Sequence, residues 1–182
     1  MRLTKIFTFL LIVFSVQLGF AQKIKWSPGY KLKWSDFQNR AARNPNDNTA
    51  AYAYCGIQYE VVKSTNPKKP VSIKVYSVFD VQKSWKRSAE LPDEILNHEQ
   101  IHFDISELYA RKLRKVIRDK IRTSGDYDQY FKTEYQKLYN EYMALQDKYD
   151  KETNHGQNAE KQAYYNQFIA TSLNNLKFYQ QL

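Results

Sequence analysis

The sequence of 182 residues predicts an α+β fold in which a small antiparallel sheet packs against a helical bundle. Two segments in the first half alternate apolar and polar residues with the period of a strand, and three longer segments beyond Trp85 carry apolar residues at helical spacings of three and four. An apolar fraction of 42% and an aromatic fraction of 15% are typical of a chain that buries a core. The length then predicts one domain.

The N-terminal residues 1–21 are typical of a secretory signal peptide. Arg2 and Lys5 precede the apolar run 6–16, and small residues lie just before the expected cleavage site. That run is too short to span a membrane, and no cysteine follows it that could carry a lipid. We therefore expect a mature domain of residues 22–182, exported to the periplasm or the extracellular space, with no stable membrane anchor.

The strands and the arm before them lie in the first half of the chain. Residues 22–48 predict an irregular arm with a short strand, which ends in the turn Asn-Pro-Asn-Asp-Asn. Residues 49–62 and 71–82 alternate in the manner of strands, and a Pro-rich turn at 66–70 separates them. These two strands are predicted to pair as an antiparallel hairpin.

Three helices are predicted after the strands. The first begins at Pro92 and ends before Gly125, two residues that favour the start and the stop of a helix. The second covers about 128–149 and the third about 158–179, with a loop at 150–156 between them.

Charge and cysteine content exclude several classes of function. The net charge of +9 falls to +7 without Arg2 and Lys5, and the basic residues at 111–122 share a predicted helix with an apolar stripe, which is typical of a solvated face. We expect no nucleic-acid partner and a monomer; a basic binder of anionic polymers would instead bind in a salt-dependent way without metal. Cys55 is the single cysteine, so no intrachain disulfide forms, and its predicted strand favours a buried apolar role over a nucleophilic one.

The first predicted helix contains His98-Glu99-Gln100-Ile101-His102, which matches HExxH. Residues four apart lie one turn above each other, so both imidazoles can bind one Zn²⁺ ion. Glu99 lies beside the first histidine, where its carboxylate can act as general base on a water molecule. The alternative is a pair of core histidines that are bonded to carbonyls or tyrosine hydroxyls.

A catalytic zinc ion needs a third protein ligand. Ile105 and Leu108 occupy the Gly and His positions of the extended HExxHxxGxxH motif, so the ligand must lie further along the chain. His155 is the remaining histidine, and Gly156 beside it allows a tight loop. The rival ligands are downstream glutamates. Glu107 is discounted because, five residues past His102, it is rotated off the metal face, and Glu152 is the strongest of the remaining Glu134, Glu141 and Glu152.

Other polar residues could support such a site. Asp104 and Asp150 are candidates for orienting the imidazole N–H groups, and Tyr149 for donating to a developing oxyanion. Glu152 lies close enough in sequence to take part as well. A plain structural role is the alternative for each of these residues.

The stretch 96–105, with Glu107, Ala110 and Arg111, resembles the bacterial domain of unknown function 922, a family described as predicted secreted zinc-dependent proteases of the zincin type. Further similar pieces are Leu32–Phe37, Cys55-Gly56-Ile57, Ser84-Trp85 and Tyr149–Gly156. The resemblance implies a zincin-like metallopeptidase domain, with His98, Glu99 and His102 as motif residues and His155 in the late element.

The sequence therefore predicts a secreted zinc hydrolase, most simply a peptidase acting on a peptide or protein substrate, and a cell-wall amide and an ester stay open as other substrates. One strand, at 49–62, is expected to hold the substrate backbone in an extended form. The alternative is an exported binding protein on the same fold without turnover. Glu99 argues against that alternative, because a structural zinc site has no use for a carboxylate beside an open position.

Overall fold

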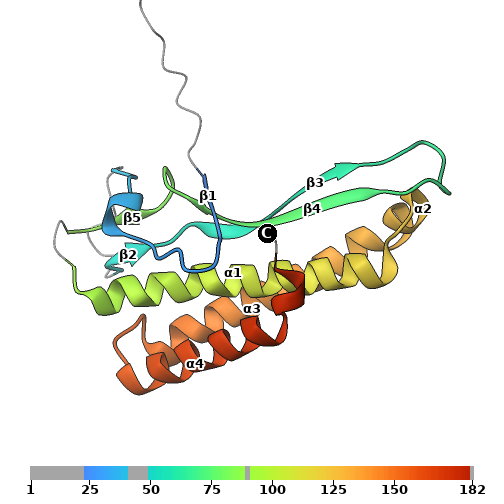
Figure 1. Cartoon of the computed structure of the whole chain (residues 1–182). Helices are drawn as coiled ribbons and strands as arrows, with labels where there is room; N and C mark the ends of the chain where they lie inside the picture. Colours follow the sequence, from blue (N-terminus) through green and yellow to red (C-terminus); the bar gives the residue numbers. More distant parts are fainter. Residues whose placement is uncertain (1–22, 41–48, 89–90, 181–182) are drawn as a thin grey trace, which may run out of the picture.

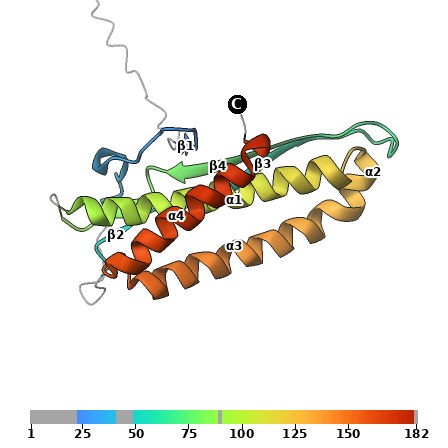
Figure 2. The same ribbon diagram turned by 60° about the horizontal axis from the view of Figure 1, so that its bottom comes forward.

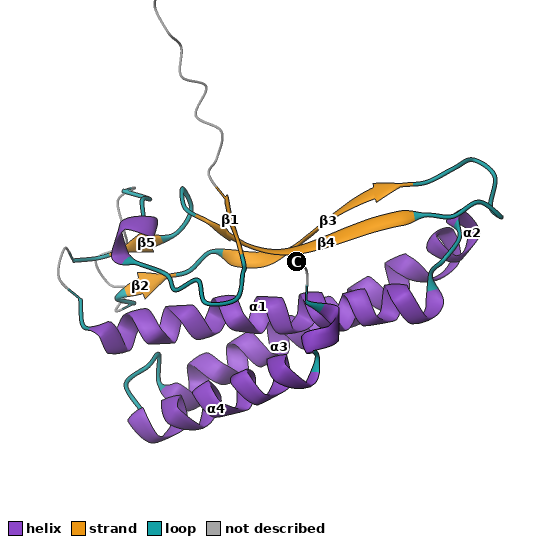
Figure 3. Cartoon of the chain, viewed as in Figure 1, coloured by secondary structure: helices purple, strands orange, loops and turns teal. Residues whose placement is uncertain are grey.

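The computed structural model describes residues 23–40, 49–88 and 91–180, and it has the predicted α+β architecture (Figures 1 and 3). The expected signal peptide and the turn at 44–48 lie outside the described residues. None of the helices in the described ranges is both long and apolar enough to cross a membrane.

The strands form two small antiparallel sheets. The larger sheet has the order β1-β4-β3, and the smaller pairs β2 with β5. In the predicted hairpin, Cys55 lies opposite Phe79 and Val62 opposite Ser72, so the expected pairing is confirmed. The bounds are β1 Lys23–Lys25, β2 Ala51–Tyr52, β3 Cys55–Val62, β4 Ser72–Asp80 and β5 Trp85–Lys86.

The segment predicted as one strand at 49–62 is divided in two. Its first part pairs with β5 and its second with β4, and the break falls at Ala53 and Tyr54. The Ala53 N–H donates to the Glu99 carboxylate, and the Tyr54 N–H donates to Ser84 Oγ. These side chains take the bonds that a continuous strand would have made, so the chain changes sheet beside the HExxH helix.

All three predicted long helices are present with shifted ends. Helix α1 ends at Lys120. Thr123 and Asp126 then form a capping box that starts the separate short helix α2. Helix α3 continues to Thr153, so the predicted loop at 150–156 is wrong in its first half. The helical elements are η1 Trp34–Asp36, α1 Asp93–Lys120, α2 Ser124–Asp126, η2 Tyr127–Phe131, α3 Lys132–Thr153, α4 Ala159–Asn175 and η3 Lys177–Tyr179.

Helix α1 lies at the centre of the molecule. It packs against β3 and β4 on one side and against α3 and α4 on the other (Figures 1 and 2). The main core fills the space between these layers, with Ile105, Leu113, Tyr149 and Ile169 fully buried. A second cluster buries Leu32 and the other apolar side chains of the N-terminal arm against the near end of α1.

A buried ionic cluster fixes the far half of α1. Glu107 is 1% exposed and accepts hydrogen bonds from Arg111 and Arg114 on the next two turns. The same guanidinium groups donate to the carbonyls of Leu173 and Tyr179. The C-terminal segment is thereby bonded to the helix that carries HExxH.

Candidate metal centre

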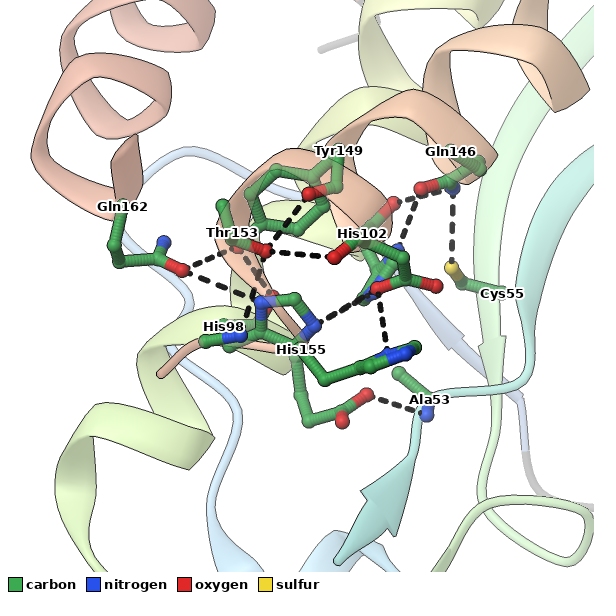
Figure 4. Close-up of polar contacts among 12 residues, drawn as sticks. Ala53, Cys55, His98, His102, Gln146, Tyr149, Thr153, His155 and Gln162 are labelled. Carbon is green, nitrogen blue, oxygen red and sulfur yellow. Dashed lines mark hydrogen bonds and ion pairs between the residues drawn. The ribbon is translucent and has the colours of Figure 1, made fainter. Parts of the chain in front are cut away.

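Three ligand atoms converge between α1 and α3, two of them from His98 and His102, which Figure 4 labels. His98 Nε2 and His102 Nε2 lie 3.1 Å apart, and Asp150 Oδ1 lies 3.0 Å and 2.9 Å from them. Within the described ranges, these side chains form a group whose ligand atoms all lie within 4.8 Å of one another. The helical spacing of four brings the two imidazoles together as predicted, and α3 supplies the carboxylate.

Two glutamine amides determine which imidazole nitrogen carries the proton. Gln146 donates from Nε2 to the His102 carbonyl, which turns its Oε1 toward His102 Nδ1 at 2.6 Å. Gln162 donates from Nε2 to Asn166, and its Oε1 lies 3.2 Å from His98 Nδ1. Since an amide oxygen only accepts, both Nδ1 atoms carry hydrogen and both Nε2 lone pairs point at the centre of the group.

This donor set is suited to zinc. Two neutral imidazole nitrogens and a carboxylate oxygen are ordinary ligands of a catalytic zinc ion, and each histidine bonds an amide oxygen through its other nitrogen, as metal-bound histidines usually do. Ligand atoms at about 2.0–2.2 Å from a tetrahedral zinc ion lie about 3.3 Å from one another. The separations of 2.9–3.1 Å here are close to that value.

The electrostatics of the group favour a bound cation. Burial acts to raise the pKa of Asp150, but the hydrogen bonds and charges of His102 and His98 outweigh it and bring the pKa well below its usual value. Burial likewise acts to lower the pKa of His102, whereas the Asp150 hydrogen bond and the charges of Glu99 and Asp150 raise it overall. Positive charge is therefore stabilised at this point, in the form of a proton or of a metal ion.

Glu99 lies beside the ligands on the same helix. It is 4% exposed, and its Oε2 accepts a hydrogen bond of 2.7 Å from the Ala53 N–H. In the part of the chain that the structure describes, its other carboxylate oxygen has no protein partner. Burial raises the pKa of Glu99, and the nearby charges of His102 and His98 oppose this shift. The carboxylate thus has one oxygen fixed by the backbone and one available for chemistry.

A cavity of about 560 Å³ opens over the group. Residues 49–58 form one wall along β2 and the start of β3, and side chains of α3 such as Tyr139 and Met143 form the opposite wall. His98, Glu99, His102 and Asp150 line this cavity, so the ligand atoms and the candidate base face the same space.

The structure does not bring His155 into the ligand group. Its Nδ1 lies 3.7 Å from Asp150 Oδ1, and its side chain is 62% exposed at the cavity rim. Asn154 and His155 both have positive φ, at 49° and 52°, and Gly156 follows with 84°. This left-handed turn brings the Gly156 Cα against the His98 ring, where an added Cβ would lie 3.0 Å from His98 Cβ. Asp150, predicted only to orient a ligand, supplies the third atom of the group instead.

The other predicted supporting residues are used elsewhere. Asp104 accepts hydrogen bonds from Trp26 Nε1 and Gln100 Nε2, away from the two imidazoles. The Tyr149 ring stacks on His98 at 4.6 Å, but its hydroxyl is directed to the His98 carbonyl and Gln162 Oε1. Glu152 accepts a hydrogen bond from Tyr165. Tyr149 therefore supports a ligand without presenting its hydroxyl to the cavity.

Cys55 lines the same cavity without the features of a nucleophile. Burial raises the pKa of its thiol to about 12, and its sulfur lies 4.0 Å from the Gln146 amide nitrogen. A nucleophilic thiol needs the opposite shift and a neighbouring base. This agrees with the apolar role expected from the sequence.

Gln146 and Gln162 were not anticipated from the sequence. Gln146 lies four residues before Asp150, so the two share a face of α3, and that spacing could have indicated a shared role. Gln162 follows the late Gly156 by six residues on another helix and has no local signal of this kind.

The fold and the site define an α+β protein that carries HExxH on its central helix and receives a carboxylate from a second helix. The family model of bacterial proteins of unknown function (DUF922) matches residues 62–156, more than half of the chain, so the chain belongs to this family. The matched range includes all three residues of the ligand group as well as Glu99 and His155. Searches of the curated proteins and of the solved structures gave no match.

Proposed function

We propose that this chain is an exported zinc-dependent peptidase in which His98, His102 and Asp150 hold the ion. The main observation in support is that their three ligand atoms lie 2.9–3.1 Å from one another, beside Glu99 and in one cavity. The pattern of residues 1–21 supports export. The substrate is a peptide or a protein.

Zinc, when bound, would act as a Lewis acid toward a water molecule and a substrate carbonyl. Glu99 takes a proton from the attacking water on the oxygen that the Ala53 N–H leaves free. The same carboxylate then gives that proton to the leaving amine nitrogen. The Gln146 and Gln162 amides keep both imidazoles oriented during these steps.

The wall at residues 49–58 suits an extended substrate. β3 is the last strand in the order β1-β4-β3, so one of its edges has no partner strand among the described residues. The start of β3, Cys55 to Gln58, lines the cavity together with side chains of α3. Backbone hydrogen bonds to this edge would align a peptide across Glu99.

The test is elemental analysis of the purified chain 22–182, followed by hydrolysis of a mixed peptide library monitored by mass spectrometry. We expect about one zinc ion per chain, lost with His98→Ala. Glu99→Gln should retain zinc and lose hydrolysis by at least about 10²-fold. Glu94→Gln makes the same chemical change at an exposed position of the same helix and should behave as the wild type.

Two outcomes contradict the proposal in different ways. A chain that takes up no zinc when the metal is supplied at neutral pH has no metal centre. A chain that binds zinc through His98 but hydrolyses nothing is the non-catalytic binding protein considered above.

A further inference from the structure

Tyr52 presents an unused hydrogen-bond donor at the cavity. It is 49% exposed and lines the same space as Glu99 and Asp150. In the described ranges, its hydroxyl has no hydrogen-bond partner, whereas the hydroxyls of Tyr142 and Tyr149 are bonded within the protein. Tyr142 donates to the Cys55 carbonyl at 3.0 Å, and the Tyr149 hydroxyl lies 2.9 Å from Gln162 Oε1.

The ring of Tyr52 is held in place relative to the candidate base. It stacks on Trp85 with centroids 6.4 Å apart and meets Tyr54 edge-on at 6.4 Å. Its backbone pairs with Trp85 in the small sheet, and the next residue, Ala53, donates its N–H to Glu99. A short rigid connection therefore joins the tyrosine to the carboxylate.

The hydroxyl also lies within the electrostatic field of the centre. Burial raises the pKa of Tyr52, and interactions with nearby ionisable groups, which include the carboxylates of Glu99 and Asp150, raise it further. Tyr52 lines one cavity with both carboxylates, so a substrate held beside the ligand group lies in the space that this side chain borders. At neutral pH the phenol keeps its proton and acts as a donor.

We propose that Tyr52 is a further catalytic residue, which donates a hydrogen bond to the substrate oxygen that becomes negative during hydrolysis. This inference rests on the proposed function. As the water oxygen bonds to the carbonyl carbon, the carbonyl electron pair moves to its oxygen and the water proton moves to Glu99. As the C–N bond then breaks, that electron pair returns and Glu99 protonates the amine. Tyr52 keeps its own proton throughout and stabilises only the charged stage.

Tyr52→Phe tests this role because it keeps the ring that stacks on Trp85 and removes only the hydroxyl. Loss of one donor to an oxyanion lowers kcat by about 10²–10³-fold. We expect that loss with little change in KM and with the zinc content of the wild type. Tyr164→Phe, at an exposed site on α4 that is 56% exposed, is the matched control and should leave kcat unchanged.

A binding measurement provides a readout that does not depend on turnover. An N-phosphoryl dipeptide resembles the charged tetrahedral stage, and its affinity for the zinc-loaded chain can be measured by calorimetry. Tyr52→Phe should weaken its binding by at least about tenfold, since one hydrogen bond to a charged group is lost.

The two proposals fail in distinguishable ways. If the wild type hydrolyses peptides and Tyr52→Phe matches it in kcat and in affinity for the phosphoryl dipeptide, Tyr52 has no catalytic role while the peptidase stands. If the wild type neither hydrolyses peptides nor binds the phosphoryl dipeptide, both proposals are overturned.

Discussion

At the scale of single residues, hydrogen bonds decide what the histidines can do. Gln146 and Gln162 fix both imidazoles with Nδ1 protonated, which leaves two lone pairs directed at one point. The HExxH pattern predicts that the two histidines lie together with Glu99 beside them, because residues four apart on one helix lie one turn above each other. The third ligand depends on how α3 is rotated against α1, which no local spacing encodes.

The identity of the third ligand is testable with two substitutions. Asp150→Ala removes the oxygen that lies 2.9–3.0 Å from both imidazoles, and it should weaken zinc binding by more than about 100-fold, the upper range for loss of an outer-shell partner. His155→Ala removes an exposed side chain and should change the affinity by less than about tenfold. Competition with a chromogenic chelator measures both.

The reverse order of effects would restore His155 as the ligand and assign Asp150 an orienting role. Asp128→Ala, at an exposed carboxylate that pairs with Lys63, serves as the control for loss of negative charge.

At the scale of elements, the sequence predicts which segments are helical or extended better than where they end. Periodicity identifies α1, α3, α4 and the β3–β4 hairpin, because each buries one regular face. The polar run after Tyr149 has the composition of a loop, yet α3 continues to Thr153, whose Oγ1 donates to the Tyr149 carbonyl. Helix α3 then ends in the left-handed turn that places Gly156 on His98.

This turn gives a prediction for Gly156→Ala. The new Cβ would lie 3.0 Å from His98 Cβ and 3.1 Å from Cγ, so the imidazole has to move and zinc affinity should fall by about tenfold or more. The left-handed φ of 84° adds a stability cost of about 1–2 kcal/mol.

Gly29→Ala separates the two effects. Gly29 has a similar φ of 79° but no atom within 4 Å of the added Cβ. It should lower the unfolding free energy by a comparable amount while zinc affinity stays that of the wild type. Equal zinc affinity in both variants would show that the Gly156 contact does not position His98.

At the scale of the whole molecule, the ligand group joins separate parts of the chain. His98 and His102 belong to α1, which contacts both sheet and helices, whereas Asp150 belongs to α3. The α+β class followed from the order of the segments, strands first and helices after. The small β2–β5 sheet could not be predicted from the sequence, because strands of two residues leave no periodic pattern.

Because the ligands come from two helices, zinc should stabilise the packed fold over the unfolded chain. At a free zinc concentration 100 times Kd, binding contributes about 2.7 kcal/mol. For a domain of this size, that raises Tm by about 5–11 °C. Thermal unfolding with and without a chelator measures the shift.

The double variant His98→Ala/His102→Ala lacks both imidazoles and should show no response to zinc or to chelator. A wild-type Tm that changes neither with added zinc nor with chelator would mean that the group binds no ion in the folded state.

The ionic cluster on α1 has a consequence for an incomplete chain. Arg111 is 2% exposed, and its two terminal nitrogens donate to the Leu173 carbonyl and to Gln180 Oε1, at the very end of the described chain. A nascent chain that has reached only α3 already contains the whole ligand group, but it lacks those acceptors for the guanidinium. Residues 173–180 therefore supply the guanidinium's acceptors from outside the segment that holds the ligand group, and a chain cut before Leu173 should keep His98, His102 and Asp150 but unfold at a lower temperature.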